Sequence, residues 1–307
     1  MTQTRIPISG TAFHLEGNGY TADIASIGAT LRTLRHDGRD LIRPFEADEL
    51  RPNFRGAVLA PWPNRVVDGT YAWNGEELQL ALTEPSRGHA LHGLAAWLDF
   101  AVIEQAPDRL SLRAVVQPQD GYPFRIEVVV DYTLGADGLH TTVTGTNVGT
   151  DAAPWGTSAH PYLVAGPGLV DEWTFSLDAA TVQTVTPDRL IPTGLSPVGD
   201  VGLDFRGERL IADTFVDHAF TDLARDADGM AGARLTADGR GVEMRWNSAC
   251  EWVQVHTADL PENPAGSRRG LAVEPMTCAP DALNSGQGVI SLAPEESSSA
   301  SWQIRSI

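Results

Sequence analysis

Residues 126–148, IEVVVDYTLGADGLHTTVTGTNV, contain two runs rich in valine, isoleucine, threonine and tyrosine, with a glycine-containing turn between them. These residue types favour strands, and polar and apolar residues alternate in parts of both runs, as in a strand with one buried face. The dipeptide Asp137-Gly138 in the turn is typical of β-hairpins. This stretch therefore predicts two strands, at residues 126–134 and 139–148.

The same pattern recurs along the chain. Helical periodicity is scarce, and the best short candidate is residues 45–50, which end before Pro52. No βαβ alternation and no internal repeat is visible, so the sequence predicts an all-β protein, a large antiparallel β-sandwich or barrel, with residues 1–307 in a single domain. Further strand-type runs and turn dipeptides are residues 110–116 (LSLRAVV), 242–246 (VEMRW), 252–257 (WVQVHT), 69–80 (GTYAWNGEELQL, two strands around Asn74-Gly75), Asp68-Gly69 and Asp238-Gly239.

The composition excludes several kinds of chemistry. The 307 residues include 22 basic and 40 acidic side chains, a net charge of −18, and every basic residue is an arginine. Without lysine, Schiff-base aldolases, pyridoxal phosphate enzymes and phosphate-binding P-loops are excluded. An acidic surface also repels nucleic acid and anionic membranes, so a neutral or cationic partner is expected.

The sequence indicates a cytoplasmic protein. No run approaches the roughly 18 apolar residues of a membrane span, and residues 1–10 (MTQTRIPISG) lack the pattern of a secretory signal. Cys250 and Cys278 are too few for a disulfide framework or a thiolate metal site, so both thiols are expected to be reduced. The sequence leaves both a monomer and a dimer open.

Two motifs near the front of the chain combine a stiff backbone with polar side chains. In residues 60–68 (APWPNRVVD), two prolines precede Asn64 and Arg65. They form either an exposed turn or a rigid turn that presents an amide and a guanidinium to a ligand. In residues 88–94 (GHALHGL), two histidines are three residues apart, but no helix and no further ligand lies nearby. A hydrogen-bonding His92 is therefore favoured over a metal ligand.

Three later residues are candidates for acid–base work. His160 precedes a proline in a segment with few charges, where an imidazole would titrate near neutrality and be held in an extended backbone. Asp217 (in TFVDHAF) and Glu274 (in LAVEPMT) are single acids among apolar residues. Each is either a strand residue facing water or a buried carboxylate that is paired or functional.

Taken together, these elements resemble the aldose 1-epimerase family, the mutarotases of the galactose mutarotase type, over nearly the whole chain. Two departures, Leu94 in place of a second glycine and Pro61-Trp62-Pro63 in place of small residues, are similar to a divergent bacterial branch of the family. The matching elements, in the family's order, are Asn64-Arg65, Leu91-His92-Gly93, His160-Pro161-Tyr162, Asp217-His218 and Glu274-Pro275.

The resemblance implies a large antiparallel β-sandwich with the site on the concave face of one sheet. It also implies an isomerase that exchanges the α and β anomers of a hexose by opening and reclosing the sugar ring, with no metal or cofactor. Glu274 would be the general base toward the anomeric hydroxyl and His160 the general acid toward the ring oxygen, on opposite sides of one pyranose. His92 would assist them.

The remaining roles concern sugar binding. The resemblance assigns Arg65 and Asp217 to the sugar hydroxyls, with Asn64 and Gln254 as weaker positional matches. Trp62 or Trp155, chosen for its proximity to the motifs, would pack on the apolar face of the sugar.

Three rival functions stay open at this point. A hexose-6-phosphate 1-epimerase would need arginines around a phosphate, for which Arg43, Arg51, Arg55 and Arg87 are available. A sugar-binding protein without catalysis would keep the binding contacts alone. A lyase or hydrolase domain on the same fold would use Asp217 and Glu274 as two carboxylates flanking the bond, which leaves the histidines without a role.

Overall fold

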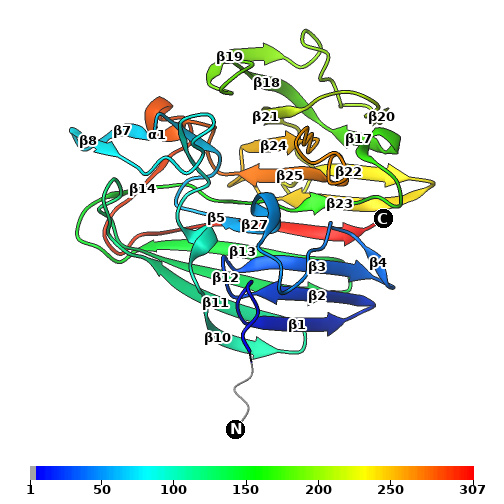
Figure 1. Cartoon of the computed structure of the whole chain (residues 1–307), viewed down its shortest axis with the longest axis horizontal. Helices are drawn as coiled ribbons and strands as arrows, with labels where there is room; N and C mark the ends of the chain where they lie inside the picture. The colour runs from blue at the N-terminus through cyan, green and yellow to red at the C-terminus, as the bar shows by residue number, and fades with distance from the viewer. Residues whose placement is uncertain (1–4) are drawn as a thin grey trace.

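The computed structural model describes residues 5–307, so residues 1–4 of the N-terminal segment considered above lie outside the described residues. Two large sheets dominate the fold (Figure 1). The nine-stranded sheet has the order β10 (Ala101–Ala106), β11 (Arg109–Val116), β12 (Ile126–Gly135), β13 (Gly138–Asn147), β27 (Ser297–Ser306), β23 (Arg240–Trp246), β22 (Ala231–Ala237), β17 (Thr174–Leu177) and β20 (Arg209–Leu210). The eight-stranded sheet has the order β19 (Pro192–Pro197), β18 (Ala179–Val185), β21 (Asp217–Leu223), β24 (Trp252–His256), β25 (Leu271–Met276), β15 (Ser158–Ala159) and β5 (Val58–Leu59), with β16 (Tyr162–Leu163) also paired to β25.

Smaller sheets complete the architecture. A four-stranded sheet at the N-terminal end lies beside the nine-stranded sheet, where the Tyr132 hydroxyl of β12 donates to Ala29 O. This sheet comprises β1 (Ala12–Gly17), β2 (Tyr20–Ala25), β3 (Thr30–His36) and β4 (Arg39–Asp40), and the two-stranded sheets are β6 (Arg65–Val67) with β9 (His89–Leu91), β7 (Thr70–Trp73) with β8 (Glu76–Gln79), and β14 (Ala153–Trp155) with β26 (Ile290–Leu292).

The predicted strands are confirmed. β12 and β13 pair antiparallel from Ile126 opposite Asn147 to Gly135 opposite Gly138. Gly138, with φ of 120°, opens β13, so the two turn residues are 136 and 137 rather than Asp137-Gly138. The other predicted runs form β11, β23, β24 and the β7–β8 hairpin, whose Asn74 and Gly75 have φ of 52° and 84°.

The helix predicted at residues 45–50 is wrong. This segment has no regular secondary structure, with a turn at residues 47–48 and a bend at residue 49. Six residues are too few to nucleate a helix without packing support, and Pro52 holds the preceding Arg51 in an extended backbone (ψ 115°). Within residues 5–307, helical structure is confined to α1 (Ala282–Ser285) and the 3-10 turns η1 (Pro52–Phe54), η2 (Ala95–Trp97) and η3 (Val170–Glu172). None of these helices is long and apolar enough to cross a membrane.

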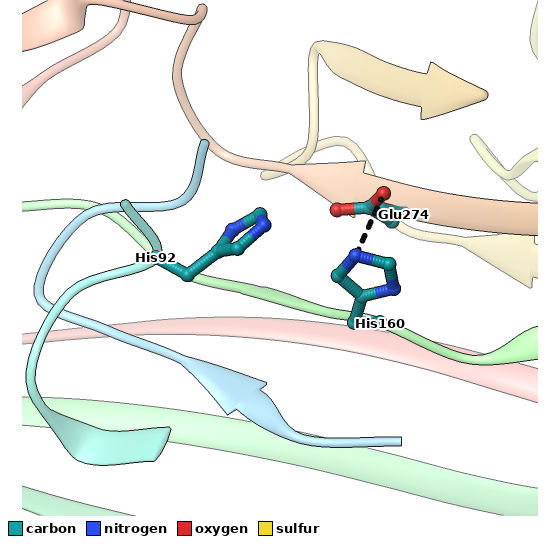
Figure 2. Close-up of side chains that lie close together, drawn as sticks. All are labelled: His92, His160 and Glu274. Carbon is teal, nitrogen blue, oxygen red and sulfur yellow. Dashed lines mark ion pairs between the residues drawn. The ribbon is translucent and has the colours of Figure 1, made fainter. Parts of the chain in front are cut away.

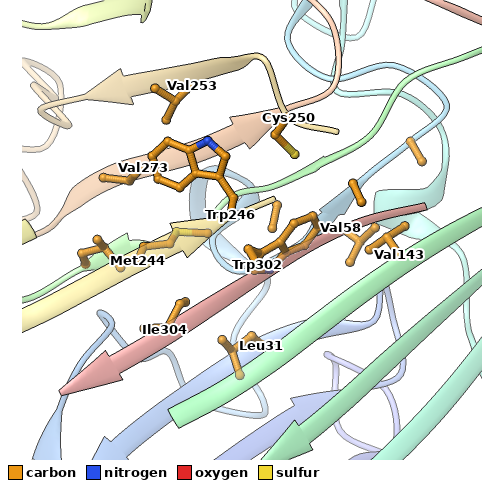
Figure 3. Close-up of a cluster of buried hydrophobic side chains, with 14 of the residues drawn as sticks. Leu31, Val58, Val143, Met244, Trp246, Cys250, Val253, Val273, Trp302 and Ile304 are labelled. Carbon is orange, nitrogen blue, oxygen red and sulfur yellow. The ribbon is translucent and has the colours of Figure 1, made fainter. Parts of the chain in front are cut away.

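The main core lies between the two large sheets (Figure 3). Trp246 of β23 and Trp302 of β27 pack in one cluster with Val253 of β24 and Val273 of β25, and both valines are completely buried. Burial of each valine contributes roughly 1.5–3 kcal/mol. Successive side chains of a strand point to opposite faces, so the residues that follow these valines point away from the core. The alternation thereby presents polar side chains on the other face of the eight-stranded sheet.

Candidate active site

A cavity of about 360 Å³ opens on that outer face. The structure brings all of the sequence-predicted site residues to its wall, although they come from widely separated parts of the chain. These residues are Asn64, Arg65, His92, His160, Asp217, Gln254 and Glu274.

The register of three strands explains one wall of the cavity. Glu274 of β25 lies directly opposite Gln254 of β24, and His256 lies opposite Asp217 of β21. Directly paired residues share a face of the sheet, as do residues two apart on one strand, so these four side chains project together. Gln254 Nε2 donates a hydrogen bond of 2.7 Å to Asp217 Oδ1. His256 was not among the residues predicted from the sequence. The available signal was that His256 lies two residues after Gln254 in the predicted strand WVQVHT, and therefore on the same face of that strand.

His160 and Glu274 form a buried pair (Figure 2). His160 follows β15, which pairs with β25 through Ser158 and Met276. The Nε2 atom of His160 is 3.4 Å from Glu274 Oε1, and the two side chains are 7% and 2% exposed. The expectation that they lie on opposite sides of a pyranose is therefore wrong. A side-by-side pair suits the chemistry, because the ring oxygen and the anomeric hydroxyl are bonded to the same carbon.

Burial determines the protonation of this pair. Desolvation, with the charge of Asp217 adding and that of Arg65 opposing, raises the pKa of Glu274 well above its ordinary value. Desolvation, followed by the charge of His256, lowers the pKa of His160 to about 3. Both shifts favour the neutral forms, a protonated carboxyl group on Glu274 and an uncharged imidazole on His160, so one titratable proton is expected in the pair, on the carboxyl group. Glu274 Oε2 and His160 Nδ1 are buried without a hydrogen-bond partner in the described part of the chain, and buried polar atoms of this kind are typical of ligand sites.

His92 adds a third polar group beside the pair. Its ring centroid is 5.1 Å from that of His160, and in Figure 2 one carboxylate oxygen of Glu274 points toward it. The backbone N–H of Asn64 donates to His92 Nδ1 (3.2 Å), so a neutral His92 carries its proton on Nε2. Burial, followed by the charge of His160, lowers the pKa of His92 well below its ordinary value and keeps it neutral. His92 is therefore a hydrogen-bond donor.

The backbone around His92 explains the Leu-His-Gly motif. His92 itself has φ of 60°, and its N–H donates to Asn64 O at 2.8 Å. At the next position a Cβ would lie 2.2 Å from Ala60 O, so Gly93 alone fits. The Oδ1 atom of Asn64 accepts the N–H of Arg65 at 2.9 Å, which directs the amide to support the turn.

Arg65 is held by a carboxylate that sequence reasoning did not single out. Its Nε and Nη2 atoms donate to Glu84 Oε2 and Oε1, at 2.7 and 3.0 Å. Glu84 also accepts a hydrogen bond from Arg87 Nη1 at 2.9 Å, and both Glu84 and Arg87 line the cavity. Glu84 is separated from Arg65 by 19 residues, so no local spacing indicated the pair.

The other arginines proposed for a phosphate do not line the cavity. Arg43, Arg51 and Arg55 donate to the backbone carbonyls of Gly266, Ala96 and Pro44, respectively. Of the four candidates, Arg87 alone lines the cavity. These arginines therefore do not converge on one anion.

Neither His89 nor the two tryptophans near the motifs contribute to the cavity. His89 does not join His92, because its Nδ1 accepts the Asp68 N–H and its Nε2 donates to Arg189 O. The prediction for Trp62 or Trp155 is wrong, since both indoles are buried in the main core. The aromatic side chains that line the cavity are Phe54 and Tyr162.

The geometry also offers a set of metal ligands. His92, His160 and Glu274 each present one ligand atom, and these atoms lie within 4.8 Å of one another. Two histidines and one carboxylate are a common donor set for divalent transition metals. Cys250 and Cys278 lie elsewhere as free, buried thiols, and burial raises the pKa of each to about 12.

Comparison with known proteins identifies the family. Residues 12–305 match the family model described as Aldose 1-epimerase. The chain belongs to the aldose 1-epimerase family. It is 37% identical over 287 residues to protein YihR of Escherichia coli K12, covering 93% of this chain and 90% of that protein. It is 31% identical over 214 residues to human galactose mutarotase, covering 63% of this chain and 60% of that enzyme.

Solved structures of this family confirm the fold. The GalM/aldose epimerase homologue of C. elegans superposes with a TM-score of 0.85 at 20% identity, covering 97% of this chain and 99% of that one. The galactose 1-epimerase of Lactobacillus acidophilus NCFM gives a TM-score of 0.80 at 18% identity, covering 96% and 94%. The fold of this aldose 1-epimerase family member is therefore the galactose mutarotase-like β-sandwich.

Proposed function

We propose that this protein is a cofactor-independent mutarotase that interconverts the α and β anomers of a neutral hexose. The observation that carries the proposal is the buried His160–Glu274 pair, 3.4 Å apart in a cavity with many hydrogen-bonding groups. Family membership supports an epimerase. General acid–base catalysis at one carbon needs two adjacent proton-transfer groups, which this pair supplies.

The reaction follows from the single proton of the pair. When sugar hydroxyls and Arg65 stabilise the carboxylate, the proton moves from Glu274 to His160. Glu274 then removes the proton of the anomeric hydroxyl while His160 protonates the ring oxygen, and the bond between C1 and the ring oxygen breaks. Rotation about C1–C2 exposes the other face of the aldehyde, and reclosure returns both protons. The total proton count of protein and sugar is unchanged.

The surrounding side chains would bind and orient the sugar. His92 donates from Nε2 to the ring oxygen or a neighbouring hydroxyl. Arg65, Asp217 and Gln254 bind hydroxyl groups, and the side-chain oxygen of Asn64 supports Arg65 by accepting the backbone N–H of Arg65. Good orientation alone can contribute several orders of magnitude to such a reaction.

The charges of the cavity favour a neutral sugar over a hexose 6-phosphate. Asp217, Asp259 and Glu262 line the cavity together with Glu274, whereas Arg65 and Arg87 are both paired with Glu84. A dianionic phosphate would have to compete with Glu84 for Arg87.

Polarimetry tests both the activity and the substrate class. We expect the protein to accelerate mutarotation of α-glucose or α-galactose, and to act at least tenfold more slowly on glucose 6-phosphate. Faster turnover of the phosphate would favour the phosphate-specific alternative. Sugar binding without faster mutarotation would instead indicate a non-catalytic binding protein.

The activity should have a wide pH plateau. The pair gains a second proton only near pH 3, because burial lowers the pKa of His160 to about 3. It loses its one proton only well above the ordinary carboxyl value, because burial raises the pKa of Glu274. We therefore expect kcat/KM to show no inflection at the ordinary histidine pKa, and to fall only toward pH 3 and at a pH well above the ordinary carboxyl value. A limb at the ordinary histidine pKa would contradict this protonation scheme, and circular dichroism at each pH separates loss of activity from unfolding.

Metal removal should not affect the reaction. Because the proposed steps use side chains alone, protein treated with EDTA and passed over a desalting column is expected to keep its full rate. Added Zn²⁺ is expected to inhibit, since His92, His160 and Glu274 can ligate it and would then be unable to transfer protons. Loss of activity with EDTA and recovery with Zn²⁺ would overturn the acid–base scheme.

A further inference from the structure

We infer that Glu84 is a positioning residue, which fixes the guanidinium of Arg65 for sugar binding. This inference rests on the proposed function. It concerns a residue from the turn after β8, outside the motifs that resemble the family.

The Arg65–Glu84 contact is bidentate and largely shielded from water. Nε donates to Oε2 at 2.7 Å and Nη2 to Oε1 at 3.0 Å, and the two side chains are 12% and 11% exposed. A fork-to-fork pair of this kind fixes the plane of the guanidinium as well as its position. It uses one edge of Arg65 and leaves both N–H groups of Nη1 for a ligand.

Glu84 also determines which carboxylate holds the charge of Arg65. Burial alone would lower the pKa of Arg65, but the hydrogen bond to Glu84 and the charges of Asp217 and Glu274 raise it above its ordinary value. Among the described residues, Arg65 forms an ion pair within 4.0 Å with Glu84 alone. Without Glu84, Arg65 would be free to pair with Asp217 or Glu274, both of which line the same cavity. Such a pair would move the guanidinium away from the position in which it binds the sugar.

The turn that carries Glu84 is itself anchored. Glu84 N–H donates to His89 O at 3.0 Å, which closes residues 84–89. Arg189, from the loop between β18 and β19, donates through Nε to Arg87 O at 2.8 Å and accepts from His89 Nε2 through its carbonyl. Hydrogen bonds therefore hold the backbone on both sides of this turn, and they fix the position from which the Glu84 carboxylate reaches Arg65. Only such support makes a bidentate clamp an efficient positioning device.

The test is a double-mutant cycle with separate measurement of kcat and KM. Glu84→Gln keeps the shape of the side chain, but its NH2 group replaces one carboxylate oxygen and so faces an N–H donor of Arg65. We expect KM to rise about 10- to 100-fold, the equivalent of one lost charged hydrogen-bond pair, with kcat changed less than about threefold. Glu84→Asp, which keeps the charge on a shorter side chain, should give a smaller increase in KM. In an Arg65→Ala background, Glu84→Gln should add less than about threefold, because the group it positions is gone.

Matched measurements separate this role from a general loss of structure. Glu76→Gln, an equal charge change at an exposed site on β8, should leave kcat and KM unchanged. Equal effects of Glu84→Gln in the two backgrounds, or a KM within twofold of wild type, would overturn the inference. The Nε–H resonance of Arg65 supplies a readout that does not need turnover. It should be protected from exchange in wild type and exposed in Glu84→Gln, so an inactive wild-type protein would refute the proposed function while still testing the clamp.

Discussion

Replacing Glu274 by glutamine is expected to lower kcat for mutarotation by about 10⁴-fold, because the amide keeps the shape of the side chain but cannot accept the anomeric proton. Glu274 is 2% exposed and its Oε2 has no hydrogen-bond partner in residues 5–307, so no neighbouring group already performs this task. Polarimetry under saturating α-glucose or α-galactose measures the loss. KM should change little, because glutamine has nearly the same size as glutamate and can still form hydrogen bonds with the sugar.

The control for this variant is a glutamate of equal charge at the surface. Glu16→Gln, whose side chain is 76% exposed, should retain wild-type activity. A Glu274→Gln enzyme with a rate within tenfold of wild type would remove Glu274 from the mechanism.

The same variant should be at least as stable as the wild type. Burial raises the pKa of Glu274, so near and above the ordinary carboxyl pKa the folded protein binds more protons than the unfolded chain. The stability contribution of this residue therefore falls as the pH rises through that value. Glutamine cannot ionise and avoids this loss, so we expect thermal unfolding of Glu274→Gln at or above the wild-type temperature. A large decrease would show that the lost activity reflects damage to the fold.

Replacing His160 by glutamine is expected to lower kcat by about 10²- to 10³-fold. Glutamine can still donate a hydrogen bond to the ring oxygen but cannot transfer a proton to it. The loss should be smaller than for Glu274, because His92 lies with its ring centroid 5.1 Å from that of His160 and can relay a proton in part. Stopped-flow or NMR exchange measurements of the anomer ratio give the rate directly.

A second variant shows whether His92 provides the residual activity. His92→Gln combined with His160→Gln should reduce kcat by at least a further tenfold. His14→Gln, at an exposed histidine in β1, serves as the control that should not change the rate. Wild-type kcat in His160→Gln would contradict the assignment of His160 as the acid.

Most of the fold was accessible from local patterns. The alternation in residues 126–148 and the turn dipeptides depend on neighbours in the chain, so β12, β13 and the β7–β8 hairpin could be predicted. The helix predicted at residues 45–50 was wrong because six residues are too few to form a helix without packing support and because Pro52 follows them. The pairing order of the sheets could not be read, because hydrogen bonds between distant strands leave no local pattern.

In the candidate site, too, some residues could be predicted from local sequence and others could not. Glu274, His160, His92 and Arg65 could be named from motifs, because their residue types suit the chemistry and their neighbours are unusual. Trp62 was misplaced, since an aromatic residue beside a motif can equally point into the core, where it is buried. Neither Glu84 nor His256 carries a local signal strong enough to identify it.

By itself the sequence determined the residue types, the alternation that makes strands, and the order of the motifs along the chain. Only the tertiary structure decided that His160 and Glu274 lie side by side rather than on opposite sides of a ring, that burial favours the neutral forms of both, and that Glu84 holds Arg65. The physical reason is that protonation depends on burial and on nearby charges, which are contributed by strands far apart in the chain. A motif can supply the acid and the base, but the folded sheets determine their distance and their pKa values.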